Sequence, residues 1–188
     1  MDKKKVCIFC FSELHRVPRV MRQILALKDE YQITAAGLTH PGLEIAEFIP
    51  ISYERPISWQ IASVARLGLR QYEKFYWSGN HVRSAYSGLK GKQFNLIIAN
   101  DMMTLPLAAK LKQESGAKLL LDAHEYEPGQ SDKLSFRLLL QDYWIYICRK
   151  YFPATDYRIT SSPGFATEYK RNFNFSFDVV DNAPFYAD

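Results

Sequence analysis

The chain has 188 residues, a formal net charge of +4, 47% hydrophobic residues and 23% charged residues, as in an ordinary globular domain and unlike a disordered, collagenous or coiled-coil chain. Gln141 and Asp142 interrupt its best apolar run, residues 138–148, which is shorter than the roughly 20 residues that span a bilayer. The three cysteines cannot form a complete disulfide framework, so we expect a reducing, cytoplasmic location.

Expected strands and helices alternate along the whole chain. Residues 6–11 are continuously apolar, which predicts a strand covered on both faces. After a loop at residues 12–18, apolar side chains recur at helical spacing as far as Leu27. The further expected strands are residues 31–38, 47–51, 94–99, 118–122, 156–160 and 177–180. The further expected helices are two within residues 58–89, then 104–114, 131–151 and 162–171.

This alternation predicts one α/β domain over residues 1–188: a doubly wound, mostly parallel, Rossmann-like sheet with helices on both faces. In such sheets ligands bind at the carboxyl ends of the strands, near the reversal of the winding. The loops at that edge are expected at residues 12–18, 100–104, 122–130, 161–164 and 181–184. Cys7 and Cys10 should point to opposite faces of the first strand, so their spacing predicts packing rather than a metal or redox site.

The expected strand at residues 118–122 runs into the richest polar segment of the chain. Asp122, His124 and Glu125 follow one another there, and Glu127 comes next. Three interpretations apply: a metal site, an acid or base group, or structural hydrogen bonding. A metal needs three or four convergent ligands, and no second group with ligand spacing completes the set, so no metal is expected. A histidine in a loop at the cleft edge favours a functional role.

Several segments occur together in a characteristic order. They are Pro18-Arg19-Val20-Met21-Arg22, residues 94–101 followed by Thr104-Leu105-Pro106, Leu120-Leu121-Asp122-Ala123-His124-Glu125, residues 156–161, and Val179-Val180-Asp181-Asn182-Ala183-Pro184. In this order and spacing the chain resembles the first half of retaining glycosyltransferases with the two-domain GT-B fold, the large group often called family four. The most specific match is the segment around His124.

The resemblance implies an N-terminal, acceptor-side domain, with the C-terminal donor-binding domain absent. The parent enzyme would transfer a sugar from a nucleotide-diphosphate sugar to a glycan or lipid-linked acceptor with retention, in surface polysaccharide synthesis. No cofactor is implied beyond the donor substrate, and this domain alone would be inactive. The alternative is a stand-alone, non-catalytic binding module or one subunit of a split glycosyltransferase.

The resemblance also implies roles for individual residues. His124 would approach the donor sugar and stabilise developing charge by position and electrostatics. Arg16 and Arg19 would approach the diphosphate, or else form a solvated helix start. Substrate contacts are also expected from Glu125, and from Asn100 and Asp101, which would either bind acceptor hydroxyls or cap the next helix.

Residues 55–92 combine basic and aromatic side chains. Seven Lys or Arg residues occur there against a single acid, Glu73. The aromatic residues among them are Trp59, Tyr72, Phe75, Tyr76, Trp77 and Tyr86. This mixture is typical of a helix at an anionic membrane surface, which predicts peripheral contact with the inner face of the plasma membrane. A core-facing aromatic stripe behind a solvated basic face is the other interpretation. Without a recognition motif, no nucleic-acid partner is expected.

Two enzyme classes are excluded by missing motifs. A dinucleotide-dependent oxidoreductase needs a glycine-rich turn after the first strand, and residues 11–18 contain no glycine. A serine hydrolase of the nucleophile-elbow type needs Gly-x-Ser-x-Gly, which the sequence lacks.

Overall fold

The computed structural model of the protein describes residues 3–183. Its strands are β1 (Lys5–Phe9), β2 (Gln32–Gly37), β3 (Glu47–Pro50), β4 (Leu96–Asn100), β5 (Lys118–Ala123), β6 (Tyr157–Thr160) and β7 (Asp178–Val179). Its helices are α1 (Pro18–Leu27), α2 (Ile57–Gly68), α3 (Tyr72–Ser78), α4 (Asn80–Leu89), α5 (Leu105–Ser115), α6 (Leu134–Leu139), α7 (Gln141–Tyr151) and α8 (Pro163–Phe173). Short 3-10 helices occupy Leu14–Arg16, Met102–Thr104, Glu127–Gly129 and Phe152–Ala154. Pro184, in the last loop expected at the ligand edge, lies outside the described residues.

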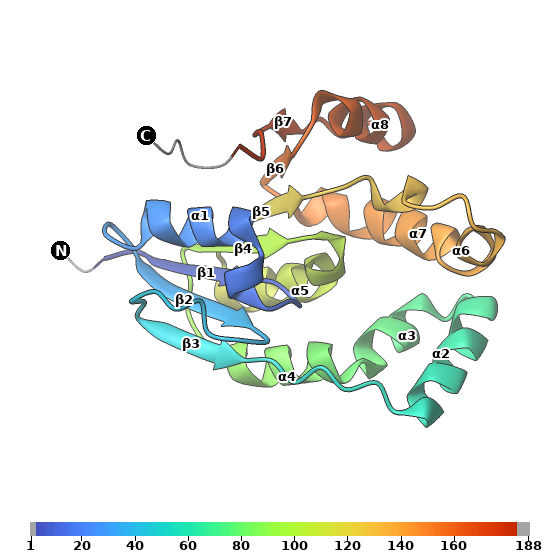
Figure 1. Ribbon diagram of the computed structural model, residues 1–188, viewed down its shortest axis with the longest axis horizontal. Coiled ribbons are helices and arrows are strands. Elements are labelled where there is room, and N and C mark those ends of the chain that lie inside the picture. The colour runs from blue at the N-terminus through green and yellow to red at the C-terminus, as the bar shows by residue number, and fades with distance from the viewer. Residues whose placement is uncertain (1–2, 184–188) are drawn as a thin grey trace.

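The seven strands form one parallel sheet in the order β3-β2-β1-β4-β5-β6-β7 (Figure 1). The chain first adds β2 and β3 on one side of β1, then returns to place β4 on its other side. The winding therefore reverses between β1 and β4, and a crevice is expected at the carboxyl ends of these two strands. The predicted doubly wound, Rossmann-like sheet is confirmed.

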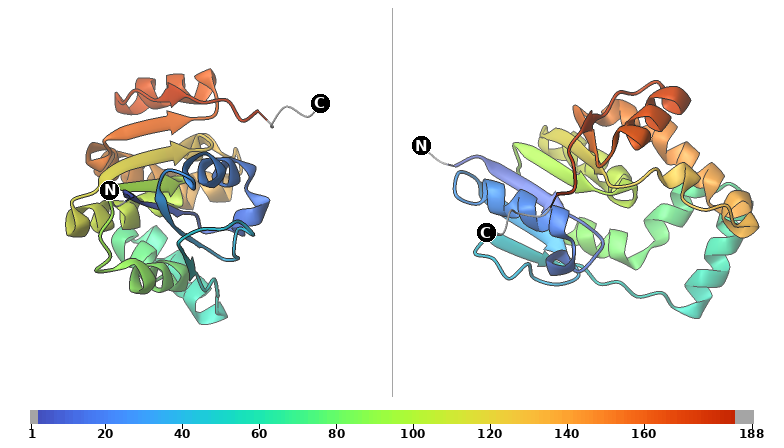
Figure 2. Two further views of the ribbon diagram at one scale, coloured as in Figure 1. Left: turned by 90° about the vertical axis from the view of Figure 1, so that its left-hand side faces the viewer. Right: turned by 45° about the horizontal axis from the view of Figure 1, so that its top comes forward.

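Two apolar clusters cover the two faces of the sheet, with helices on both sides (Figure 2). Alternation along β1 sends Cys7 and Phe9 into the larger cluster, which includes residues of α4, α5 and α7. Cys10 belongs to the smaller cluster, beneath α1, so the two cysteines face opposite ways as predicted. Both thiols are buried and free, and burial raises the pKa of Cys10 to about 12.

The prediction of two helices within residues 58–89 was wrong, because three helices form. The break at Gly79 was expected, whereas the break between α2 and α3 was not. There Arg70 adopts φ 54°, and the Gln71 amide donates to the Arg66 carbonyl at 2.8 Å. This is a Schellman ending, in which glycine usually takes the left-handed position. With arginine there, the sequence carried no stop signal.

The long helix expected at residues 131–151 is also divided. Helix α6 starts only at Leu134, and Leu140 separates it from α7 with φ −102° and ψ −28°. The side-chain amide of Gln141 donates to the Pro128 carbonyl at 3.0 Å, which fixes the start of α7 against the preceding loop. No proline or glycine marks this break, so periodicity alone could not reveal it.

The aromatic side chains of residues 55–92 pack inward. Tyr72 and Tyr76 are buried in the larger apolar cluster, and Phe75, Trp77 and Tyr86 pack against it half-buried. The core-facing interpretation of the aromatic stripe is therefore the one the fold adopts. Within residues 3–183 no helix is long and apolar enough to cross a membrane.

Candidate functional site

A buried ion pair supports the carboxyl ends of β4 and β5. The carboxylate of Asp122, on β5, accepts from Arg19 Nε at 2.6 Å, and both side chains are buried. Arg19 Nη1 also donates to the Val180 carbonyl at 2.7 Å, which ties α1 to the chain beyond β7. Removing one member of such a pair leaves an uncompensated charge in the interior. Arg19 and Asp122 therefore define how α1 sits over the strand ends.

Gln23 lies one helical turn after Arg19 and extends this network. Its side-chain nitrogen donates to Asp122 Oδ2 at 2.7 Å and to Asn100 Oδ1 at 3.0 Å. The amide nitrogen of Asn100 donates back to Gln23 Oε1 at 2.9 Å. Residues four apart on a helix share one face, so the spacing from Arg19 was the signal that could have identified Gln23. Sequence reasoning missed it.

His124 sits directly above this network. Its Nε2 lies 3.2 Å from Asn100 Oδ1, and its Nδ1 lies 3.2 Å from Asp101 Oδ1. Both ring nitrogens thus face oxygen atoms. A proton on Nδ1 would bond the imidazole to the Asp101 carboxylate, and a proton on Nε2 would bond it to Asn100. Burial, opposed by the nearby His124 and reinforced by Asp122, raises the pKa of Asp101.

Asp101 holds its position at the expense of backbone strain. Its φ is 68° and its ψ is 155°, a region that only glycine visits readily and that costs on the order of 1–3 kcal/mol. Its amide donates to the Asp122 carbonyl at 2.9 Å, and its carbonyl accepts from Thr104 Oγ1 at 2.8 Å. These bonds fix the strained residue and set its carboxylate beside the imidazole. The side chains of Asn100 and Asp101 do not cap the following helices, so the capping prediction was wrong.

The structure separates the two arginines that were predicted together. Arg19 is buried in the network, whereas the Arg16 side chain is 74% exposed and pairs with Glu13 at 2.7 Å. Arg16 matches the solvated interpretation. Arg19 is neither solvated nor open to an anion in this structure, because two of its side-chain nitrogens already donate hydrogen bonds inside the protein. Within residues 3–183 its Nη2 makes no hydrogen bond.

His124 and Glu125 stand between two cavities. One of about 390 Å³ is lined by these two residues together with Val17, Pro18, Arg19, Ser161, Phe165 and Asn182. The other, of about 290 Å³, is lined by them with Asp101, Met103, Glu127, Gln130 and Trp144. The loop that presents both residues is anchored through its backbone: Ser161 Oγ donates to the His124 carbonyl and Tyr169 OH to the Glu125 carbonyl, each at 2.7 Å. The predicted loops therefore meet around His124.

Glu127 is the second site residue that sequence reasoning did not select. Its side chain is 8% exposed, lines the smaller cavity and has no hydrogen-bond partner among the described residues. Burial, with added repulsion from Asp101 and Glu125, raises the pKa of Glu127 to about 7. Carboxylates are exposed by default, so its position in the sequence alone gave no sign of burial.

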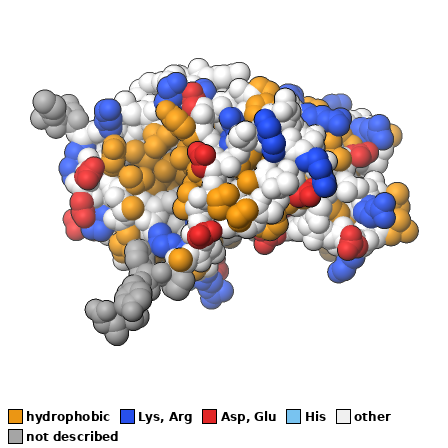
Figure 3. Space-filling view, turned by 90° about the horizontal axis from the view of Figure 1, so that it is seen from above, with side chains coloured by type: hydrophobic (Ala, Val, Ile, Leu, Met, Phe, Trp, Pro, Cys, Tyr) orange, Lys and Arg blue, Asp and Glu red, His pale blue; other side chains and the backbone are white. Residues whose placement is uncertain are grey.

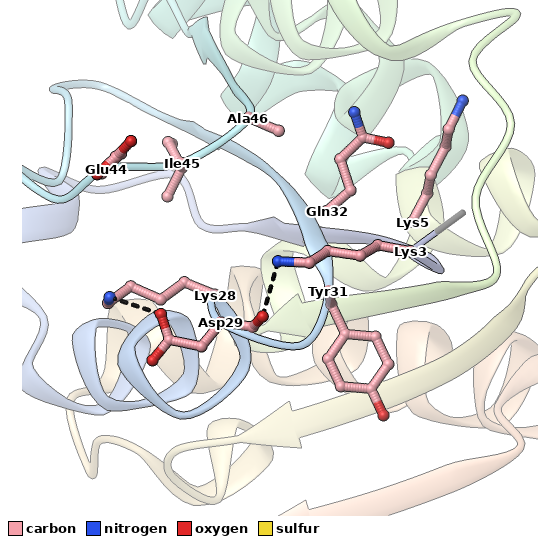
Figure 4. A pocket seen from close by; sticks show the side chains of 9 residues that line it. All are labelled: Lys3, Lys5, Lys28, Asp29, Tyr31, Gln32, Glu44, Ile45 and Ala46. Carbon is pink, nitrogen blue, oxygen red and sulfur yellow. Dashed lines mark hydrogen bonds and ion pairs between the residues drawn. The ribbon is translucent and has the colours of Figure 1, made fainter. Parts of the chain in front are cut away.

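A larger cavity than these two lies elsewhere. It measures about 790 Å³ and opens at the amino end of the sheet, where Lys3, Lys28 and Asp29 line it (Figure 4). Lys28 pairs with Asp29 at 2.9 Å, and Lys3 donates to the Asp29 carbonyl at 2.7 Å. The long side chains that line this cavity are exposed or half-buried, and its charged groups already bond to one another. We therefore place the candidate site at His124. Among residues 3–183, no three acidic, histidine or cysteine side chains are placed to hold a metal ion.

No protein family model matches the sequence, and no curated protein is significantly similar to it. Solved structures do match. Arabidopsis thaliana UGT89C1 with UDP-L-rhamnose is 12% identical, with a TM-score of 0.57 over 99% of this chain and 54% of that chain. Sucrose-phosphate synthase from Thermosynechococcus elongatus is 12% identical, with a TM-score of 0.58 over 94% and 47%. A UDP-N-acetylglucosamine 2-epimerase is 14% identical, with a TM-score of 0.51 over 95% and 48%.

The chain thus spans about half the length of these solved structures. Identities this low show a shared fold and no more. The predicted fold, one half of a GT-B architecture, is confirmed by these matches. Family four membership and retention stay predictions.

Proposed function

We propose that this chain is the acceptor-side half of a glycosyltransferase that uses a nucleotide-diphosphate sugar and retains the anomeric configuration. The observation that carries the proposal is the supported His124 just after β5, where it contacts the residues that end β4, with a cavity on each side of it. The fold neighbour UGT89C1 has been solved with UDP-L-rhamnose and with quercetin, so the same architecture accommodates a nucleotide sugar and an acceptor.

His124 is the proposed contact to the donor sugar. A retaining transfer develops positive charge on the sugar ring and negative charge on the leaving diphosphate. Asn100 and Asp101 hold the imidazole by both nitrogens, so it needs no reorganisation when it meets the sugar. Such preorganisation lowers the barrier through position and electrostatics rather than through covalent chemistry.

Arg19 remains the proposed contact to the diphosphate, but only through one of its three side-chain nitrogens. Only its Nη2 is without a partner in the described chain, and Arg19 lines the larger cavity. Because this nitrogen is buried, a phosphate oxygen would have to displace the side chains that cover it before it could complete the donor capacity of the guanidinium. Arg16, exposed and paired with Glu13, would reach the diphosphate only by leaving that pair.

The smaller cavity is the proposed place for an acceptor hydroxyl. Its carboxyl groups, Asp101 and Glu127, offer hydrogen-bonding atoms beside the apolar Trp144 and Met103. A sugar presents hydroxyl groups at its edge and C–H groups on its face, so this combination suits a glycan or the head of a lipid-linked acceptor. Glu125, exposed at the same edge, extends the surface available to either substrate. No metal takes part in the proposed chemistry.

The experiment has two arms. We expect the coding sequence after Asp188 to continue into a second domain with a glycine-rich loop and two glutamates eight residues apart. We then expect a screen of nucleotide-sugar donors with the whole protein to identify a donor whose sugar is transferred. NMR of the anomeric proton of the product should show that the configuration is retained. The 188-residue chain alone should show no transfer and only weak nucleotide-sugar binding by calorimetry. Micromolar binding by this chain alone, or inversion in the whole protein, contradicts the proposal.

A further inference from the structure

Helices α2 and α6 leave a group of apolar side chains uncovered at one end of the molecule. The apolar tip consists of Ile57, Ile61, Val64, Leu69, Leu134 and Leu138. These side chains are between 56% and 75% exposed. Figure 1 shows the two helices at the same end, beyond the carboxyl ends of the strands. Isolated exposed apolar residues are common in proteins, whereas a cluster on adjoining helices marks an interaction surface.

Helical geometry explains why these side chains face outward together. Ile57, Ile61 and Val64 lie four and then three residues apart and so share one face of α2. The buried residues of α2, Ser63 and Leu67, lie on another face, toward the protein. In α6, Leu134 and Leu138 lie one turn apart on the outer side of the buried Phe136. Each helix therefore carries apolar residues on two faces, one that packs against the protein and one that is exposed to solvent.

Basic side chains surround the apolar tip. Arg55, Lys74, Lys133 and Arg137 are all exposed, and none of them forms an ion pair within residues 3–183. At the right-hand end of Figure 3, which holds α6, blue basic side chains lie beside orange apolar ones. Of the neighbouring acids, Asp142 pairs with Arg70 at 3.2 Å and Glu73 pairs with Lys150 at 2.8 Å. Glu54 and Asp132 therefore remain against the four cations, of which Arg55 also lies over the Tyr53 ring. The border of the tip is therefore net positive.

We propose that the apolar tip inserts into the surface of an anionic lipid bilayer. Aliphatic side chains bordered by cations match the acyl layer and the charged headgroups of such a membrane. A second copy of the chain would place the same cations against each other, so charge complementarity favours the lipid surface. This interface differs from the one expected from the sequence, because the aromatic residues pack inward and α6 lies outside residues 55–92.

The tip is also connected to the candidate site. The loop that carries His124 and Glu127 runs directly into α6, and Trp144 of α7 lines the smaller cavity. A membrane at the tip would bring a lipid-linked acceptor to the same edge of the sheet as His124. This consequence rests on the proposed glycosyl transfer, whereas lipid binding itself does not. The test therefore measures binding without transfer.

The experiment is co-sedimentation of this chain with vesicles of phosphatidylglycerol and phosphatidylcholine, or of phosphatidylcholine alone. We expect binding to the anionic vesicles and at least about tenfold weaker partitioning to the neutral ones. The double variant Ile61→Ser, Leu134→Ser should lower the partition coefficient for anionic vesicles at least about tenfold. The variant Lys133→Gln, Arg137→Gln should produce a loss of similar size and reduce the dependence on salt.

The chain offers matched controls away from the tip. Tyr157 and Val180 are also exposed apolar residues, and Lys170 and Arg171 are exposed cations on α8. Tyr157→Ser, Val180→Ser and Lys170→Gln, Arg171→Gln should bind vesicles as the unmodified chain does. Circular dichroism confirms folding of each variant. Equal binding by the tip variants and these controls, or a dimer in sedimentation equilibrium that binds no vesicles, overturns the proposal.

Discussion

The polar network beneath His124 and the apolar tip violate the usual distribution of residues in opposite ways. The network places Arg19 and Asp122 in the interior, where charges are costly. The tip places Ile61 and Leu134 in solvent, where apolar groups gain nothing for the fold. The buried charges of the network depend on the bonds that Arg19, Gln23 and Asp122 make with one another, so substitutions there should alter stability. The tip has no such bonds, so substitutions there should alter binding alone.

The largest expected effect is on the buried ion pair. Arg19→Met should lower the free energy of unfolding by about 3–5 kcal/mol, because Asp122 would stay buried without its cation. Urea denaturation of the variant and of the unmodified chain measures this difference in the free energy of unfolding. Arg16→Met is the matched control: its exposed pair with Glu13 should contribute less than about 1 kcal/mol. Equal effects of the two substitutions would show that the buried network is not what holds α1 in place.

Glu127 should make stability depend on pH. Its pKa is raised from the ordinary 4.5 to about 7. Below pH 4.5 the carboxyl is protonated in both the folded and the unfolded chain, so it contributes no difference. As pH rises toward 7 the unfolded chain releases a proton that the folded chain retains, and the free energy of unfolding falls by on the order of 3 kcal/mol.

Glu127→Gln removes this titration. The variant should therefore gain stability relative to the unmodified chain between pH 5 and pH 8, as measured by urea denaturation at each pH. Glu125→Gln, at an exposed neighbouring carboxylate, should change stability little at either pH. A constant difference between Glu127→Gln and the unmodified chain would mean that Glu127 is not desolvated.

A smaller effect is expected at the anchor of the His124 loop. Tyr169→Phe deletes the hydroxyl that donates to the Glu125 carbonyl at 2.7 Å and should lower the free energy of unfolding by about 1 kcal/mol. Tyr157→Phe serves as the control, because Tyr157 is 56% exposed. A stability loss at Tyr157 equal to that at Tyr169 would argue against the anchor.

The smallest stability effect is expected at the apolar tip. Ile61→Ser should change the free energy of unfolding by less than about 0.5 kcal/mol, because Ile61 is 68% exposed. Leu67→Ser, on the same helix at 8% exposure, should cost about 2 kcal/mol or more. A large loss at Ile61 would mean that the tip is part of the fold and would remove the contrast with the polar network.

The sheet was predictable from the sequence because its central strands β1, β4 and β5 are largely apolar on both faces and the strands alternate with amphipathic helices. The position of His124 followed from the same rule, since residues at the carboxyl end of β5 must lie at the edge of the sheet. The contacts between residues far apart in the sequence could not be predicted in this way. Asp122 meets Arg19 and Gln23 from about a hundred residues away, and only the packing of α1 on the sheet brings them together.

Helix ends were the other feature that the sequence concealed. Arg70 takes a backbone conformation that normally signals glycine, and Leu140 interrupts a helix with no proline or glycine present. The apolar tip remained hidden for the same reason: because α2 ends at Gly68 and α6 is a separate helix, the outward faces of both differ from those of the longer helices that periodicity predicted.

The central claim is that His124 is half of a glycosyl-transfer site. Its most direct test is the turnover of His124→Ala in the whole protein, with folding confirmed, against His40→Ala. His40 is an exposed histidine on another loop and controls for loss of an imidazole. His124→Ala should lower kcat by about tenfold or more, whereas His40→Ala should leave it unchanged. Unchanged turnover in folded His124→Ala protein would contradict the claim.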